Sequence, residues 1–247
     1  MRLNKMQMKD TKSVKLRRIG MLGGMGVEAT IALMQRVHGA TLAEDDKDQV
    51  PMIIDMNPQV PSRIEHLIKQ SGVNPGPTLA DMAARLEVAG AEALVIPCNT
   101  AHYYADWVEA SSEIPLIHMP KLTCAHLAKL LPAGSGVGIL ASPATEQIGL
   151  FQSLLEDVGL TAIYPKNTTA ILASIQRIKK AGPCADDLAL LNEEVIRLKN
   201  RGACAILVGC TEFSLLSKQI KSDISIVDGL DILVDEIIAF SGAKRRQ

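Results

Sequence analysis

The chain has 247 residues, of which 47% are hydrophobic, and a formal net charge of −1 at pH 7. This charge argues against nucleic acid as the main partner, because phosphate binding needs a concentrated basic surface, and 3% aromatic residues are too few for base stacking. No apolar run reaches the roughly 18 residues that a membrane span needs.

The N-terminal segment and the cysteines predict where the protein resides. Residues 1–16 are basic but lack the apolar stretch of a secretory signal, so we expect a flexible tail. The five cysteines are an odd number in a chain without an export signal. This combination indicates free thiols in a reducing cytoplasm, and not a disulfide framework.

Short apolar runs alternate along the chain with longer amphipathic segments. The runs predict buried strands at residues 17–22, 51–56, 93–97, 114–118, 136–140, 160–164, 204–208 and 224–227. Helical spacing of apolar residues predicts helices at 77–89, 120–131, 145–158, 168–181 and 185–200, and a last helix at 228–240. This alternation predicts an α/β fold with parallel sheets flanked by helices.

An internal repeat predicts two similar halves. The sequence LEVAGAEALVIPCNT at residues 86–100 is echoed, at a constant offset, by LKNRGACAILVGCTE at residues 198–212. A weaker echo relates IGMLGGMG at 19–26 to VGILASPA at 137–144. We therefore predict two α/β domains that face each other across a cleft. Their expected boundaries are 17–118 plus 228–247 for the first, and 119–227 for the second.

The repeat pairs Cys98 with Cys210. Each follows a predicted buried strand and begins a polar segment, in IPCNTAH and VGCTEFS. Ligands of parallel α/β sheets bind at the carboxyl ends of strands. There, at the start of a helix, we expect the helix dipole to stabilise the thiolate and lower the pKa of each cysteine. A base on one face of an α-carbon and a proton donor on the other predict racemisation.

Other interpretations of these motifs stay open. Cys98 and His102 are four residues apart, as a metal-binding pair on a helix would be, but no second pair completes a zinc set. GMGVEA fits the dinucleotide-binding pattern through Gly24 and Gly26, although Asp55 lies further on than the ribose contact of that motif. The rival interpretation of the glycine loop is a contact with a substrate carboxylate.

Several polar residues are candidates for binding a substrate carboxylate. Arg63 follows a proline-containing loop just past a predicted strand, where an arginine can bind a carboxylate with two hydrogen bonds. Lys180 in IKKAG is a less specific candidate. Asn99, Thr100, Thr211 and the adjacent backbone N–H groups can also bind an anion.

Four motifs together resemble the aspartate/glutamate racemase family, most closely its aspartate racemase branch: GMLGGMGVEAT, MNPQVPSR, IPCNTAH and VGCTEFSLL. The resemblance extends from about residue 17 to residue 240. It implies two α/β domains related by a pseudo-twofold axis, an active site between them, and no pyridoxal phosphate, metal or other cofactor. It also implies a homodimer and a small acidic amino acid as substrate, with Cys98 and Cys210 as the catalytic pair.

The resemblance further implies how the substrate is held. It assigns Arg63 and Lys180 to the side-chain carboxylate of the substrate. Further carboxylate contacts are implied for the segments around Met25, Asn99, Thr100, Thr145, Thr211 and Glu212. The chain departs from the family pattern at Val27, where proline is usual, at Ser62, where aspartate is common, and before Thr145, where glycine is usual. These departures leave both thiols in place and bear on the choice between aspartate and glutamate.

Alternative functions exist within the same architecture. They are a hydantoin racemase, an enzyme resembling maleate isomerase or a decarboxylase, and a non-catalytic small-molecule sensor. The presence of both cysteines argues against the sensor, and Arg63 with Lys180 favours a dicarboxylate over a hydantoin. A dehydrogenase is the last alternative, and it would require binding of NAD.

Overall fold

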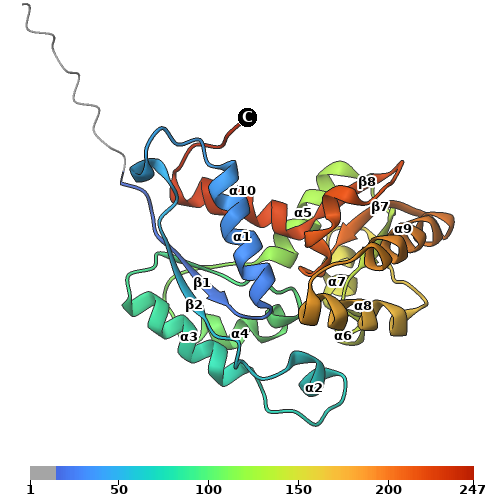
Figure 1. Ribbon diagram of the computed structural model, residues 1–247, viewed down its shortest axis with the longest axis horizontal. Coiled ribbons are helices and arrows are strands. Elements are labelled where there is room, and N and C mark those ends of the chain that lie inside the picture. Colours follow the sequence, from blue (N-terminus) through green and yellow to red (C-terminus); the bar gives the residue numbers. More distant parts are fainter. Residues whose placement is uncertain (1–14) are drawn as a thin grey trace, which may run out of the picture.

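Two four-stranded sheets form the frame of the molecule (Figure 1). The structure, a computed structural model, describes residues 15–247, so the predicted tail lies outside the described residues except for its last two positions. All eight predicted strands are present. They are β1 (Ile19–Gly23), β2 (Met52–Met56), β3 (Ala93–Val95), β4 (Leu116–Ile117), β5 (Gly136–Leu140), β6 (Thr161–Ile163), β7 (Ala203–Val208) and β8 (Ser225–Asp228).

The two sheets have the same topology. Their strand orders are β2-β1-β3-β4 and β6-β5-β7-β8, and all neighbouring strands are parallel. The central strands β1 and β5 are buried along their whole length, as continuous apolar runs in covered parallel sheets should be. The predicted class, α/β with two similar parallel sheets, is confirmed.

Helices cover both faces of each sheet. On the first sheet, α1 (Val27–Ala40) and α10 (Gly229–Ser241) pack on one face, and α3 (Gly76–Val88) with α4 (Ala105–Glu109) on the other. On the second sheet, α8 (Thr168–Ala181) and α9 (Ala185–Asn200) pack opposite α5 (Met119–Leu130) and α7 (Leu150–Glu156). Along β1, Ile19 and Met21 face the first layer and Leu22 the second, because side chains of a strand alternate.

The sequence repeat corresponds to a repeated structural unit. Helices α3 and α9 each end at a glycine with positive φ, +92° at Gly90 and +95° at Gly202. Glycine takes this left-handed conformation without the cost that a Cβ brings, so the chain can leave the helix and enter the next strand. Strands β3 and β7 follow, and each leads to its cysteine. Cys98 and Cys210 therefore hold equivalent positions in the two sheets.

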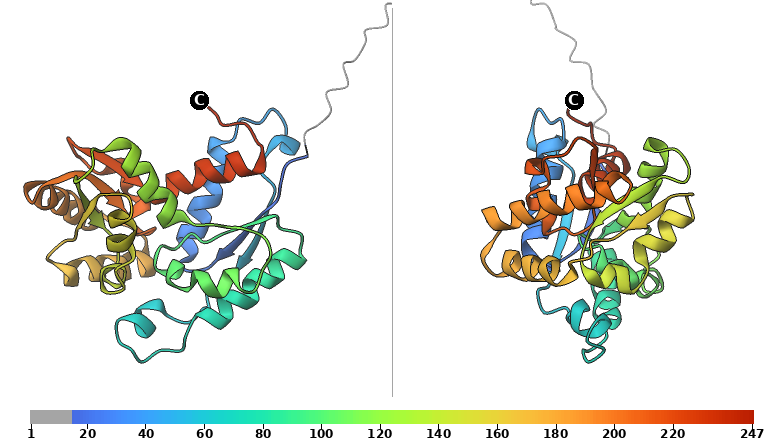
Figure 2. Two further views of the ribbon diagram at one scale, coloured as in Figure 1. Left: turned by 180° about the vertical axis from the view of Figure 1, so that it is seen from behind. Right: turned by 90° about the vertical axis from the view of Figure 1, so that its right-hand side faces the viewer.

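Helices α5 and α10 join the two sheets. Helix α10 leaves β8 of the second sheet and packs beside α1 on the first (Figures 1 and 2). Helix α5 contacts both α10 and α7. The predicted helix at 145–158 is wrong as one element. It is divided into α6 (Pro143–Gln147) and α7, because Gly149 has φ +66° and interrupts the helical path.

The remaining helical elements of the fold are short. The short elements are α2 (Arg63–Leu67), which the sequence did not predict, and the 3₁₀ turns η1 (Asp46–Asp48), η2 (Thr100–Tyr104), η3 (Phe213–Leu215) and η4 (Ser217–Gln219). None of the helices within residues 15–247 combines the length and apolarity needed to cross a bilayer.

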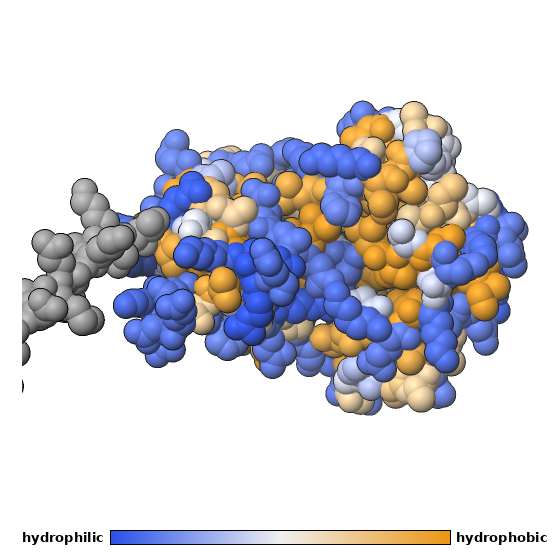
Figure 3. Space-filling model, turned by 90° about the horizontal axis from the view of Figure 1, so that it is seen from above, coloured by the Kyte–Doolittle hydropathy of each residue, from blue (hydrophilic) through white to orange (hydrophobic). Residues whose placement is uncertain are grey.

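The surface of the molecule carries both polar and apolar residues. In the view from above, polar residues prevail on the left and apolar ones gather towards the right (Figure 3).

Candidate active site

A narrow pocket of about 50 Å³ is lined by residues of both sheets. Its lining comes from the segments that follow the carboxyl ends of β1, β3, β5 and β7, the two central strands of each sheet, and from α2 and α8. These residues are Met25, Ser62, Arg63, Ile64, Cys98, Asn99, Thr100, Ser142, Ile175, Lys179, Gly209, Cys210, Thr211 and Glu212. Both cysteines of the repeat therefore face one pocket.

A tight turn after β3 presents Cys98. The Cys98 carbonyl accepts hydrogen bonds from the backbone N–H of Ala101, at 3.2 Å, and from Nδ1 of His102, at 2.9 Å. Burial, with a smaller contribution from His118, lowers the pKa of His102 to about 3, so its ring is neutral. Because a carbonyl only accepts, the Nδ1 of His102 carries the proton. His102 thus holds the cysteine turn, and its Nδ1 is not available as a metal ligand beside Cys98.

Cys210 belongs to a chain of polar contacts. Its Sγ lies 2.9 Å from Oε2 of Glu212, and Oε1 of Glu212 lies 3.2 Å from Nζ of Lys179. Burial alone lowers the pKa of Lys179, but the Glu212 carboxylate, with smaller contributions from Cys98 and Cys210, raises it above its ordinary value. The ammonium group therefore stays charged and balances the buried carboxylate.

The expected lowering of the cysteine pKa is wrong for Cys210. Burial first, and then the adjacent Glu212 carboxylate, raise the pKa of this thiol well above its ordinary value. The turns after Cys98 and Cys210 are the short 3₁₀ elements η2 and η3, and not α-helices. Such turns align too few peptide dipoles to outweigh burial. Cys210 is therefore a protonated thiol at neutral pH.

The glycine loop after β1 brings Met25 to the pocket. The backbone N–H of Gly24 donates to Oγ1 of Thr30, at 2.9 Å, and that hydroxyl donates to the carbonyl of Gly26, at 3.0 Å. Gly24 has φ +92°, and a Cβ there would lie 2.4 Å from the backbone of Asn57. The loop thus needs a glycine at this position for both reasons.

We expect Gly24→Ala to lower the free energy of unfolding by about 3 kcal/mol, because the added methyl group meets backbone atoms that cannot move aside. Gly39→Ala is the matched control. Nothing lies within 4 Å of the added Cβ at that position in α1, so this variant should keep or slightly raise stability. Urea unfolding followed by circular dichroism measures both. Equal stability of the two variants would contradict the argument.

Arg63 and Asn99 supply hydrogen-bond donors to the pocket. Arg63 begins α2, and its Nη1 donates to the carbonyls of Val60, at 3.0 Å, and Pro61, at 2.7 Å. Asn99 is buried, and its Nδ2 has no hydrogen-bond partner within residues 15–247. Because an unpaired buried amide is costly, such a group in a pocket wall suits a ligand that accepts its hydrogen bond.

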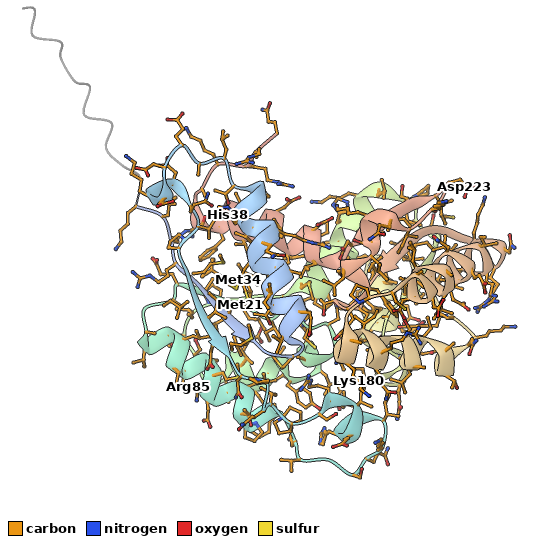
Figure 4. The ribbon with its side chains drawn as sticks, in the orientation of Figure 1. Met21, Met34, His38, Arg85, Lys180 and Asp223 are labelled. Atoms are coloured by element: carbon orange, nitrogen blue, oxygen red, sulfur yellow. The ribbon has the colours of Figure 1, made fainter. Side chains whose placement is uncertain are left out.

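Two predicted binding residues do not line the pocket. Thr145 is fully buried in α6, where its Oγ1 donates to the carbonyl of Ser142 at 2.7 Å, so it supports the Ser142 turn instead. Lys180, labelled on α8 in Figure 4, is replaced in the lining by its neighbour Lys179. At 3.6 residues per turn, Lys180 lies opposite the buried stripe of α8, which Ile171, Ile175 and Ile178 form.

Sequence reasoning also missed some residues that the pocket brings together. Besides Lys179, these are Ser62, Ile64, Ser142, Ile175 and Gly209. A signal for Lys179 was present, since it stands four residues after Ile175 and so lies on the same side of α8. The others carried no signal, because their place in the lining depends on how the two sheets face each other.

Helices α2 and α6 meet beside the pocket. Their N-cap residues, Ser62 and Ser142, line the pocket, and Nε2 of Gln147 in α6 donates to the carbonyl of Leu67 in α2, at 3.1 Å. A wider hollow of about 530 Å³ lies beside Tyr164 and Arg201, but its lining holds neither cysteine nor histidine. Of these two hollows, the narrow pocket is therefore the one that holds the paired thiols.

Comparison with known proteins places this arrangement in a family. The profile of the Asp/Glu/Hydantoin racemase family matches residues 22–237. The chain belongs to this family of isomerases. The resemblance drawn from the motifs is thereby confirmed at the level of the family, and so is the prediction of an isomerase.

Individual relatives match over nearly the whole chain. The broad specificity amino-acid racemase RacX of Bacillus subtilis is 27% identical over 232 residues, which cover 90% of this chain and 96% of RacX. The structure of aspartate racemase from Picrophilus torridus is similar with a TM-score of 0.78 and 24% identity, covering 93% of this chain and 96% of that one. An aspartate racemase homologue from Pyrococcus horikoshii has a TM-score of 0.72 and 19% identity, covering 92% and 100%. These two likenesses establish the shared fold.

Proposed function

We propose that this protein racemises aspartate, with glutamate as the second candidate substrate, by a two-base mechanism that uses no cofactor. One observation carries the proposal: two cysteines at equivalent positions of a repeated unit line the same pocket. A proton-transfer reaction that must work on both faces of one carbon needs two such groups. The names of the relatives, among them an aspartate racemase and a broad specificity amino-acid racemase, support the reaction class.

The proposed reaction consists of two proton transfers. The thiolate of one cysteine removes the α-proton, so that the C–H bond breaks, an S–H bond forms and the electron pair stays on the α-carbon. The second cysteine then donates its proton to the opposite face and becomes a thiolate. Because its pKa is raised, Cys210 is the proton donor in the resting protein, and Cys98 acts first as the base. The opposite enantiomer requires the exchanged protonation state.

The polar groups of the pocket suit a dicarboxylate. Arg63 and Lys179 provide two cationic groups, and the Nδ2 of Asn99, which has no hydrogen-bond partner among residues 15–247, offers a neutral donor. Donors that face the substrate α-carboxylate would stabilise the charge that develops when the α-proton leaves. In this proposal Lys179 takes the role that the family resemblance implied for Lys180. Glu212 holds the proton of Cys210 in position and is a contact for the substrate ammonium.

The pocket must widen to bind this substrate. A volume of about 50 Å³ holds only a few water molecules. The contact between Gln147 and Leu67 links the two short helices at its edge. We therefore include in the proposal a separation of α2 from α6 when substrate enters, followed by closure that excludes water.

A single experiment tests the function. The purified protein, without added cofactor, is incubated in deuterium oxide with L-aspartate, L-glutamate or a 5-substituted hydantoin, and the products are separated by chiral chromatography. We expect D-aspartate to form with deuterium at its α-carbon. Racemisation of the hydantoin alone would replace the proposal with hydantoin racemase. Tight binding of aspartate without turnover would replace it with a sensor.

We also propose boundaries for the two domains and an assembly state for the protein. Each sheet with its helices forms one unit, and packing of α10 on α1 supports adding residues 228–247 to the first unit, 17–118, opposite the second, 119–227. We also propose a homodimer. Analytical ultracentrifugation measures the mass of the particle, and a monomer at assay concentration would contradict this part.

A further inference from the structure

A partly buried ion-pair network lies beside the segment that carries Cys210, outside the pocket lining. Arg36 of α1 places Nη1 at 2.8 Å from both Oδ2 of Asp228 and Oδ1 of Asp231. Asp228 is the last residue of β8 and the N-cap of α10. Only 4% of its side chain is exposed, against 20% for Arg36. Residues far apart in the sequence thus meet at the junction of the two sheets.

The Asp228 carboxylate is fully paired. Its Oδ1 accepts from the hydroxyl of Ser214, at 2.6 Å, and from the backbone N–H of Leu230, at 3.0 Å. Its Oδ2 accepts from the hydroxyl of Ser217, at 2.7 Å, and from Arg36. A buried carboxylate with four donors holds the groups around it in one geometry, because losing any partner leaves a buried charge less compensated.

Ser214 connects this network to Cys210. Its backbone N–H donates to the carbonyl of Cys210, at 3.2 Å, and its own carbonyl accepts a hydrogen bond from Nη2 of Arg36. Leu215, the next residue, packs against the hydrophobic cores of both sheets. The turn that carries Cys210 is therefore attached, through one serine, to a helix of the first sheet.

Helix α1 connects Arg36 with the wall of the pocket. The helix begins directly after the glycine loop, whose Met25 lines the pocket beside Cys98 and Cys210. Arg36 therefore lies on the helix that begins beside the part of the pocket wall contributed by the first sheet. A displacement of the Arg36 guanidinium relative to Ser214 would thus move Cys210 relative to the first-sheet wall of the pocket.

We infer that Arg36 is a positioning residue, which sets the place of the Cys210 thiol relative to the first sheet through Ser214 and Asp228. The inference rests on the proposed function for its catalytic consequence, but the positional claim does not need turnover. Arg36 does not line the pocket, so it acts through Cys210 and not on the substrate. Misplacement of a reacting group by about 1 Å can cost a hundredfold in rate.

Arg36→Lys tests this inference, because a lysine keeps the charge beside Asp228 but has no second arm for the Ser214 carbonyl. The matched control is Lys218→Met, which removes another cation paired with Asp231, from the exposed side of the same cluster. Ser214→Ala is a milder second variant, which deletes only the hydroxyl bond to Asp228. Alkylation of each cysteine by iodoacetamide is timed by peptide mass spectrometry, alongside kcat and KM for aspartate.

In Arg36→Lys we expect the alkylation rate of buried Cys210 to rise threefold or more, while that of Cys98 stays unchanged. In an active enzyme, kcat should fall about tenfold with KM within twofold, and Lys218→Met should behave like the wild type. Unchanged alkylation of Cys210, or an equal rise at both thiols, would overturn the inference. Because alkylation needs no substrate, failure of the proposed function would appear separately, as absent turnover in the wild type.

Discussion

Replacing either Cys98 or Cys210 with serine is expected to reduce racemisation of aspartate by about a thousandfold, the scale of positioned acid–base catalysis. A serine hydroxyl fills almost the same space but is a far weaker acid, so neither proton transfer through it competes. Racemisation is followed by chiral chromatography. Cys204→Ser is the matched control, because Cys204 is exposed in β7, the strand that leads to Cys210. It should keep full activity.

Exchange with solvent separates the roles of the two thiols. In deuterium oxide, the cysteine that remains in each variant can still remove and return the α-proton of the enantiomer that faces it. We therefore expect Cys210→Ser and Cys98→Ser to incorporate deuterium into opposite enantiomers without inverting them. Exchange of the same enantiomer by both variants, or wild-type racemisation by either one, would refute the two-base mechanism.

Replacing Lys179 with methionine is expected to lower kcat/KM for aspartate by about a hundredfold. The change removes a charge-assisted contact worth about 3 kcal/mol and leaves the carboxylate of Glu212 buried without its cation. Because the positive charge of Lys179 lowers the pKa of Cys210, its loss should raise that pKa further. The alkaline limb of the pH–rate profile, where Cys210 loses its proton, should then move to higher pH.

Lys180→Met is the control for this prediction, since it makes the same chemical change one position along α8. It should leave kcat/KM within twofold of the wild type, because Lys180 does not line the pocket. Steady-state kinetics of both variants with L- and D-aspartate, at several pH values, provide the comparison. A large loss in Lys180→Met together with a small loss in Lys179→Met would return the binding role to Lys180.

Local patterns in the sequence were enough to predict the eight strands, most of the longer helices and the pairing of the two thiols, but they did not predict α1, α2 or α4. The helix–glycine–strand–cysteine unit is visible in the sequence, because apolar periodicity and a left-handed glycine act over a few neighbouring residues. Cys98 and Cys210 stand at the same place in both copies, so the repeat predicted that they act as a pair. The break at Gly149 shows the limit of this method. Apolar periodicity does not reveal that the backbone changes conformation at a single residue.

Burial and charge in the folded molecule decided the rest. The raised pKa of Cys210 depends on the apolar surroundings and on Glu212, and the choice of Lys179 over Lys180 depends on how α8 turns against the second sheet. Arg36 and Asp228 are separated by 192 positions, and nothing in the sequence pairs them. Sequence alone determined where the strands and most of the longer helices lie, because those preferences are local. Only the tertiary structure determined the environment of each thiol, because solvation and electrostatic interactions depend on neighbours that the fold brings from distant parts of the chain.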